Sequence, residues 1–158
     1  MIVRLTGHGL HVDLPHGWEA RIWRHPGGAP TLHAASFALP THDGDFGSRA
    51  TAAMGPGDAL LVLTEYLPGG GLQPGRGLFA PAQPSRLEVH DFRARALAIG
   101  RPGQVGCQRF FTAHGRPLCL YAVLHLRPAA VAGASAAPTH ALNGVLRSIG
   151  IEPGPGVG

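Results

Sequence analysis

Two neighbouring runs of alternating apolar and polar residues constrain the fold more than any other feature of the chain. The first run covers Gly9–Leu14 and the second covers Trp18–Arg24. An alternation with a period of two is typical of a strand that is buried on one face. Because only Pro15–Gly17 lies between them, the two runs are predicted to pair as an N-terminal hairpin.

The far end of the chain carries the pattern of a helix. Its apolar residues recur at helical spacing and would form one buried face, made of Leu142, Val145, Leu146 and Ile149. We expect Thr139 to cap a helix over 140–149 and Gly150 to end it. Gly144 inside this helix costs about 1 kcal/mol relative to alanine, which indicates close packing against a sheet.

The residues between these ends predict further strands and one short helix. Strands are expected over 31–39, over 59–66 and, with a bend, over 86–97, and the second of these is apolar enough to be buried on both faces. Ser48 is placed to cap a short helix over 48–54, which Gly55 would end. The longest loop is expected at 68–84, where glycine and proline are dense.

A second hairpin is predicted over 105–126, with His114-Gly115 as its two-residue turn. In this register Phe110 lies opposite Cys119, and Cys107 lies opposite Ala122. Successive side chains of a strand point to opposite faces. The two cysteines are therefore expected to be separate thiols without a disulfide bond.

These elements together predict an α+β fold. We expect a mostly antiparallel, twisted sheet, packed by the short middle helix and the C-terminal helix in an α/β/α sandwich-like arrangement. A chain of 158 residues is of the right length for one domain, which we place at 1–151. An Ala/Pro-rich connector is expected at 128–138 and a loose tail at 152–158.

The charge pattern argues against nucleic acid as a partner. All 13 basic residues are arginine, the net charge is only +4, and the arginines are scattered along the chain rather than clustered as a nucleic-acid surface requires. No stretch of 18 apolar residues that could span a membrane occurs, and Met1–Gly9 does not resemble a signal peptide. We therefore expect no membrane insertion and a cytoplasmic location.

The most polar cluster of the chain is His42-Asp43-Gly44-Asp45. His42, Asp43 and Asp45 are weak candidates for holding a cation or for a weak hydrolytic site, and His90 is a further candidate. The segment is too short for a calcium loop, and a turn in which the aspartates bond their own backbone is the simpler interpretation. No metal site is predicted.

Motifs for catalysis or for a cofactor are not evident. None of the five serines lies in a Gly-x-Ser-x-Gly turn, and both cysteines lie in apolar strands where a buried thiol is inert. The glycine-rich segment 69–77 lacks the Gly-Lys-Ser/Thr of a phosphate-binding loop. We expect no catalytic residues and no cofactor, although the sequence does not exclude an enzyme.

Two aromatic residues are candidates for contacting a protein partner. Trp23 falls off the alternation of its strand, and Phe79 lies in the long loop. Exposed aromatic residues of this kind often dominate binding. Arg24 and Arg76, which lie near them in the sequence, complete the expected contact set.

The segment Leu14-Pro15-His16-Gly17-Trp18 and the ending Leu146-Arg147-Ser148-Ile149 resemble Mog1/PsbP-like domains, which include the DcrB-like and LpqN-like bacterial proteins. The resemblance covers the expected hairpin, the final helix and the order of the strands, about half of the chain. It implies an antiparallel sheet covered by helices. It also implies a binding or chaperone-like role without a catalytic centre.

The leading functional hypothesis is a non-enzymatic protein-binding adaptor or chaperone-like domain, docking a partner through a sheet edge or an apolar groove. The alternative is a small-molecule or metal-binding domain with a weak hydrolytic site around His42–Asp45. A third hypothesis, a homo-oligomer or a subunit of a larger bacterial assembly, fits the low content of charged residues, 14%.

Overall fold

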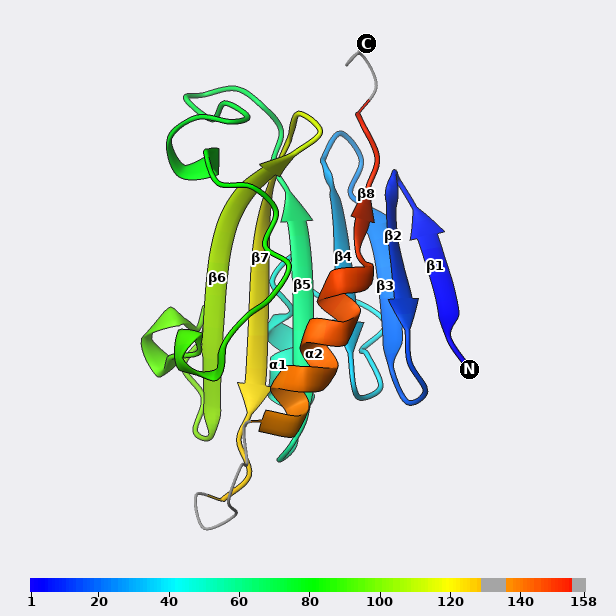
Figure 1. Ribbon diagram of the computed structural model, residues 1–158, viewed down its shortest axis with the longest axis vertical. Coiled ribbons are helices and arrows are strands. Elements are labelled where there is room, and N and C mark those ends of the chain that lie inside the picture. The colour runs from blue at the N-terminus through cyan, green and yellow to red at the C-terminus, as the bar shows by residue number, and fades with distance from the viewer. Residues whose placement is uncertain (129–135, 155–158) are drawn as a thin grey trace.

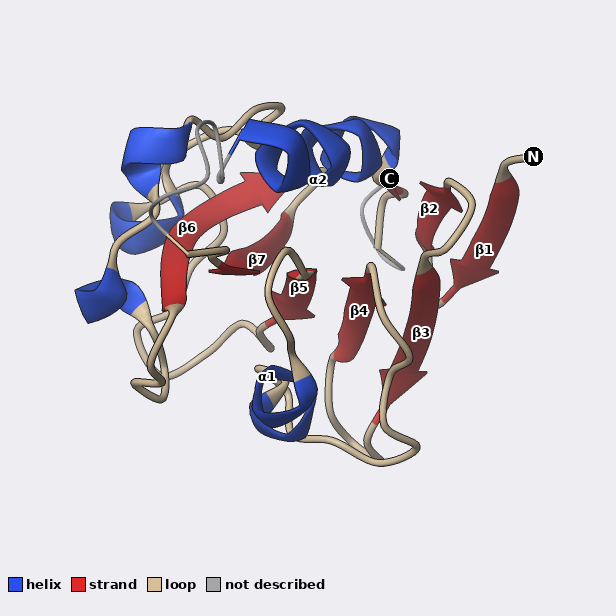
Figure 2. Ribbon diagram, turned by 90° about the horizontal axis from the view of Figure 1, so that it is seen from below, coloured by secondary structure: helices blue, strands red, loops and turns tan. Residues whose placement is uncertain are grey.

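The computed structural model describes residues 1–128 and 136–154. It has an α+β architecture in which all strand pairs are antiparallel, as the sequence predicts. Helix α2 (Ala136–Ser148) covers one face of the main sheet, and the short helix α1 (Ser48–Ala53) lies against the other (Figures 1 and 2). The expected helix–sheet–helix layering is therefore confirmed.

The main sheet has five strands in the order β3-β4-β5-β7-β6. In chain order these are β3 (Glu19–Arg24), β4 (Pro30–Ala35), β5 (Ala59–Glu65), β6 (Gln104–Ala113) and β7 (Arg116–His125). The strands β5 and β7 are buried on both faces, because a helix covers each side of the sheet. The edges are β3 and β6.

The first two predicted strands do not pair with each other, so the expected N-terminal hairpin is wrong. A separate sheet of three strands has the order β1-β2-β8, with β1 (Val3–Gly7), β2 (Leu10–Leu14) and β8 (Gly150–Ile151). The strand β2 therefore pairs with β1 and β8, whereas β3 pairs with β4. Alternation correctly gives the buried face of each strand, but it carries no information about the neighbour to which the strand bonds.

The turn between β1 and β2 explains why β2 pairs with β1. His8 and Gly9 have φ angles of 51° and 76°, and His114 and Gly115 have 49° and 76°. Positive φ at both central residues defines the two-residue turn whose twist matches a hairpin. The dipeptide His-Gly thus closes the β1–β2 hairpin in the same way as the correctly predicted β6–β7 hairpin.

The C-terminal helix begins at Ala136, so Thr139 lies inside it and is not its cap. The predicted apolar stripe is confirmed, because all four of its side chains are buried against the main core. Gly144 faces open space, so its expected close packing is wrong. The connector expected at 128–138 falls largely outside the described residues, as does the end of the tail, whereas Glu152 donates its backbone N–H to the carbonyl of Gly9.

The strand expected over 86–97 is also wrong. This segment forms two short 3-10 turns, Val89–Asp91 and Ala94–Ala96, and its ladder pairing with β6 is an isolated bridge between Arg93 and Gly106. The carboxylate of Asp91 accepts a hydrogen bond from the backbone of Glu88. Such local side-chain bonds compete with a strand ladder.

Two of the remaining predictions concern element ends and cysteines. Strand β4 ends at Ala35, four residues before the expected Leu39. The register of β6 and β7 is confirmed, with Phe110 opposite Cys119 and Cys107 opposite Ala122. Both thiols are free and buried, and burial raises the pKa of Cys119 to about 11.

Within the described residues, neither helix is both long and apolar enough to cross a membrane.

Candidate functional site

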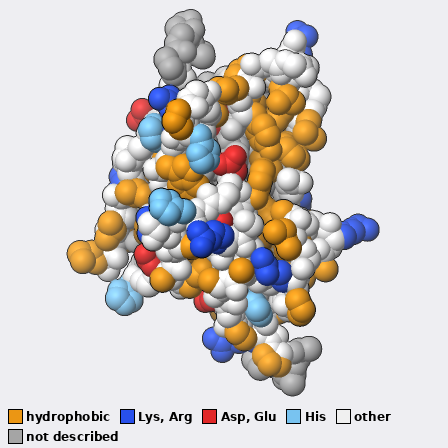
Figure 3. Space-filling model, turned by 180° about the vertical axis from the view of Figure 1, so that it is seen from behind, with side chains coloured by type: hydrophobic (Ala, Val, Ile, Leu, Met, Phe, Trp, Pro, Cys, Tyr) orange, Lys and Arg blue, Asp and Glu red, His pale blue; other side chains and the backbone are white. Residues whose placement is uncertain are grey.

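A cavity of about 620 Å³ lies at the β3 edge of the main sheet. It is lined by strand β3, by His33 of β4, and by residues 39–43 of the segment that connects β4 to α1. Histidine and basic side chains gather beside hydrophobic ones on this face of the molecule (Figure 3). We call this cavity the Trp23 pocket.

Strand β3 contributes Trp23 and Arg21 from the same face. In the register of the sheet Arg21 lies opposite His33, and Trp23 lies opposite Thr31. Trp23 is half-buried, and its ring meets the ring of His33 edge-on at 4.4 Å between centroids. Trp23 is thus an apolar residue at a position where the alternation of β3 predicts a polar one, and it forms part of the pocket wall.

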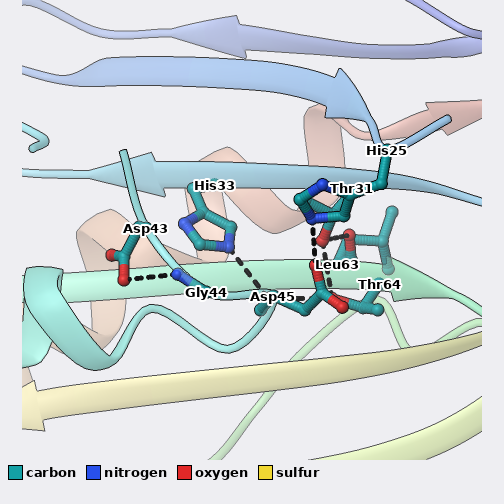
Figure 4. Close-up of polar contacts among 8 residues, drawn as sticks. All are labelled: His25, Thr31, His33, Asp43, Gly44, Asp45, Leu63 and Thr64. Atoms are coloured by element: carbon teal, nitrogen blue, oxygen red, sulfur yellow. Dashed lines mark hydrogen bonds and ion pairs between the residues drawn. The ribbon is translucent and has the colours of Figure 1, made fainter. Parts of the chain in front are cut away.

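His33 is almost completely buried, with 1% of its surface exposed. Its Nε2 donates to the main-chain carbonyl of Asp45 at 2.9 Å (Figure 4). Burial lowers the pKa of His33 and outweighs the opposite effect of that bond and of the carboxylates of Asp43 and Asp45. The ring is therefore neutral, with its proton on Nε2 and a lone pair on Nδ1.

Asp45 holds the connecting segment against the sheet. Its carbonyl also accepts a hydrogen bond from the Thr64 hydroxyl of β5 at 3.0 Å, and Thr64 bonds in turn to Thr31 of β4 at 2.6 Å. Its carboxylate meets Nε2 of His25 at 3.1 Å. These contacts hold the connecting segment against β4, β5 and the residue that follows β3 (Figure 4).

Asp43 is a cap for α1 rather than a free carboxylate. Its Oδ1 accepts from the backbone N–H groups of Gly44 and Arg49, and its Oδ2 accepts from that of Ala50, all within 2.8–2.9 Å. The expected cap, Ser48, makes no such bond, and Gly47 occupies the N-cap position. The aspartate is preferred because its two oxygens can satisfy several unpaired amides at once.

The two aspartates among the weak metal candidates are therefore engaged in structural contacts. Asp43 and Asp45 have their carboxylates bonded as described, while the imidazole of His42 is exposed and has no partner among the described residues. Throughout residues 1–128 and 136–154, no group of three or more histidine, cysteine, aspartate or glutamate side chains is placed to hold a metal ion.

Three side chains with hydrogen-bond donors stay unpaired around the pocket. Within the part of the chain that the structure describes, no hydrogen bond or ion pair is found for the guanidinium of Arg21, the indole N–H of Trp23 or the imidazole of His42. Arg21 and His42 are exposed and line the cavity. The pocket thus combines an apolar wall with donors that lack acceptors.

The structure unites some of the predicted site residues and separates others. Trp23, His42 and Asp43 line one pocket although the sequence analysis assigned them to different hypotheses. Arg24 is exposed on β3 but is not among the lining residues. His90 is exposed beside Asp91 in a 3-10 turn, with 3.8 Å between Nε2 and Oδ1.

The expectation that Phe79 is an exposed contact is wrong. Only 2% of Phe79 is exposed, and its ring packs against Tyr66 and Phe110 at 5.5 and 5.7 Å between centroids. The aromatic residue anchors the 68–84 loop on β6, because burying a ring contributes more than leaving it in water. Arg76 of that loop is exposed, at the β6 side of the sheet and away from Trp23.

Most residues that line the pocket, Arg21 and His33 among them, are not candidates from the sequence. Arg21 lies in the alternating run Trp18–Arg24, and His33 lies in the expected strand over 31–39. The available signal for His33 is its place in an expected strand, because a histidine that is buried there must find a hydrogen-bond partner. No sequence pattern indicates that Leu39–Asp43 folds back over β3.

Comparison with known proteins adds no assignment. The chain matches no family model, no curated protein and no solved structure. The resemblance to Mog1/PsbP-like domains therefore stays a prediction.

Proposed function

We propose that the protein is a non-enzymatic binding domain that takes a small molecule into the Trp23 pocket. The observation that carries the proposal is the cavity of about 620 Å³, which falls within the range of small-molecule sites, roughly 300–1,000 Å³. Its lining also has the usual composition of such sites, an apolar and aromatic wall with a few polar groups.

Binding without hydrolysis is favoured by the state of the aspartates. A general base or a metal ligand needs a carboxylate oxygen that can face the substrate. Both oxygens of Asp43 hold backbone amides of α1, and the carboxylate of Asp45 pairs with His25. The weak hydrolytic activity considered for His42–Asp45 is therefore not part of the proposal.

A protein-binding adaptor or chaperone-like role is the second candidate. The observation in its favour is that β3 is an edge strand of the main sheet and carries the half-buried Trp23. An edge strand can pair with an extended segment of a partner while a neighbouring pocket accepts a side chain. Under this candidate the protein acts in the cytoplasm, as a homo-oligomer or as a subunit of a larger bacterial assembly.

The small-molecule proposal is tested by a fragment screen with two-dimensional amide NMR. Hits are expected to shift residues of β3 and of 39–43. Thr41 lines the pocket and is exposed, so Thr41→Trp should fill the cavity and abolish these shifts. Thr6→Trp is the matched control, because Thr6 is exposed on β1 and is not a lining residue.

Shifts that survive Thr41→Trp, or that cluster away from the pocket, would contradict the proposal. The adaptor candidate is tested by co-purification from source cells with a tagged protein and its Trp23→Ala variant. A stoichiometric partner that is lost in the variant, at unchanged thermal stability, would favour the adaptor over the small-molecule proposal.

A further inference from the structure

We infer that the Trp23 pocket selects a small molecule with a carboxylate attached to a flat apolar body, Arg21 being the residue that recognises the carboxylate. This inference rests on the proposed function and specifies its ligand. It follows from which polar groups of the pocket are already satisfied and which are not.

The two carboxylates in and beside the pocket are used internally. The carboxylate of Asp43 accepts three backbone N–H groups, and that of Asp45 accepts from His25. Asp43 is the one carboxylate that lines the cavity in the described part of the chain, and its backbone contacts occupy three of its roughly four acceptor sites. The structure thus offers little to a positively charged group.

The donors, by contrast, are free. Arg21 lies on the wall of the cavity without an acidic neighbour bonded to it, and the indole N–H of Trp23 is two positions further along the same face. A guanidinium presents a planar fork of N–H groups that matches the two oxygens of a carboxylate. His42, across the pocket on the connecting segment, can supply a further N–H.

The remaining wall is apolar and accounts for the body of the ligand. Ile22, Leu39 and Pro40 line the cavity together with the Trp23 ring. The edge-on packing of Trp23 on His33 fixes the indole in one orientation. A flat ligand can stack on a ring held in this way. A rigid, flat ligand also loses less conformational freedom on binding than a flexible chain does.

The test compares three probes of one shape, namely 2-naphthoate, neutral 2-naphthamide and (2-naphthyl)methylammonium. Affinity is measured from the NMR shift of the Trp23 indole N–H, assigned with Trp23→Phe. We expect naphthoate to bind about tenfold more tightly than naphthamide, which corresponds to one charge-assisted hydrogen bond, and the ammonium probe to bind most weakly.

Arg21→Gln should remove the preference for naphthoate over naphthamide. Arg24→Gln is the matched control, since Arg24 is an exposed arginine of the same strand that does not line the pocket, and it should keep the preference.

Equal binding of the three probes at Trp23, or a preference that survives Arg21→Gln, would overturn this inference and leave the proposed function standing. If no probe shifts Trp23 although the fragment screen finds other ligands in the pocket, this inference alone fails. If the screen finds none there either, the proposed function fails with it.

Discussion

The guanidinium of Arg116 and the carboxylate of Glu65 form a buried ion pair where the two sheets meet. Nε of Arg116 donates to Oε1 of Glu65 at 2.8 Å, and only 8% and 14% of the two side chains are exposed. The same guanidinium donates to the carbonyls of His8, Gly9 and Glu152 at 3.0–3.2 Å. One side chain of β7 therefore ties the β1–β2 turn and the end of β8 to the main sheet.

Replacing Arg116 with methionine should strongly destabilise the fold. The change leaves Glu65 charged and buried without a partner and leaves three carbonyls without their donor, a defect that typically costs about 3–5 kcal/mol. The free energy of unfolding from urea denaturation measures the loss. The control is Arg4→Gln, which breaks the solvent-exposed pair with Asp13 and should leave the denaturation midpoint unchanged. Equal effects of the two variants would show that Arg116 is not a link between the sheets.

The stability of the fold should fall as the pH drops below 6.5. Burial lowers the pKa of His33 from its ordinary value of 6.5, so the unfolded chain binds a proton in a range where the folded chain does not. Protonation then favours unfolding, and the stability present above pH 6.5 is lost progressively as the pH falls from 6.5 through the lowered pKa of the folded chain. Urea denaturation between pH 7.5 and 5 should show a flatter profile for His33→Gln, whose amide keeps a donor for Asp45. The exposed His140 provides the control His140→Gln, which should follow the parent chain, and an unchanged slope in His33→Gln would refute this assignment.

Asp43 should contribute more to α1 than Ser48 does. Asp43→Ala removes the acceptor of the amides of Arg49 and Ala50, and loss of such a cap costs about 1–2 kcal/mol. Ser48→Ala should be close to neutral, because Ser48 makes no capping bond. Thermal melts of the two variants measure the difference. A larger loss of stability in Ser48→Ala would support Ser48 as the cap, as predicted from the sequence.

Two glycines of the C-terminal region should respond to alanine in opposite directions. A methyl group on Gly150 would collide with the ring of His11 on the paired strand β2, so Gly150→Ala should weaken the junction of β8 and β2. Gly144 faces open space on α2, and Gly144→Ala should stabilise the helix by up to about 1 kcal/mol. Unfolding free energies test both changes. The cost of Gly150→Ala should largely vanish in a His11→Ala background, and a cost that persists there would point to another cause.

Local structure was largely predictable from the sequence. The alternation in Leu10–Leu14 and Glu19–Arg24 identified both strands, and His114-Gly115 identified a hairpin and its register. The apolar stripe of α2 was also found. These features depend on neighbouring residues, since backbone sterics and the period of side-chain burial act over a few positions. The strand β1 was missed although His8-Gly9 repeats the turn signal of His114-Gly115.

The tertiary structure alone decided which strands pair and where a pocket forms. Pairing of β2 with β8 joins segments separated by more than 130 residues, and its energy comes from contacts that no short stretch of sequence contains. The same holds for Trp23, His33 and Asp43, which meet because the segment after β4 folds back and is held by Asp45 and Thr64. A residue type fixes what a side chain can bond, whereas only the folded chain decides which of those bonds are satisfied internally and which remain for a ligand.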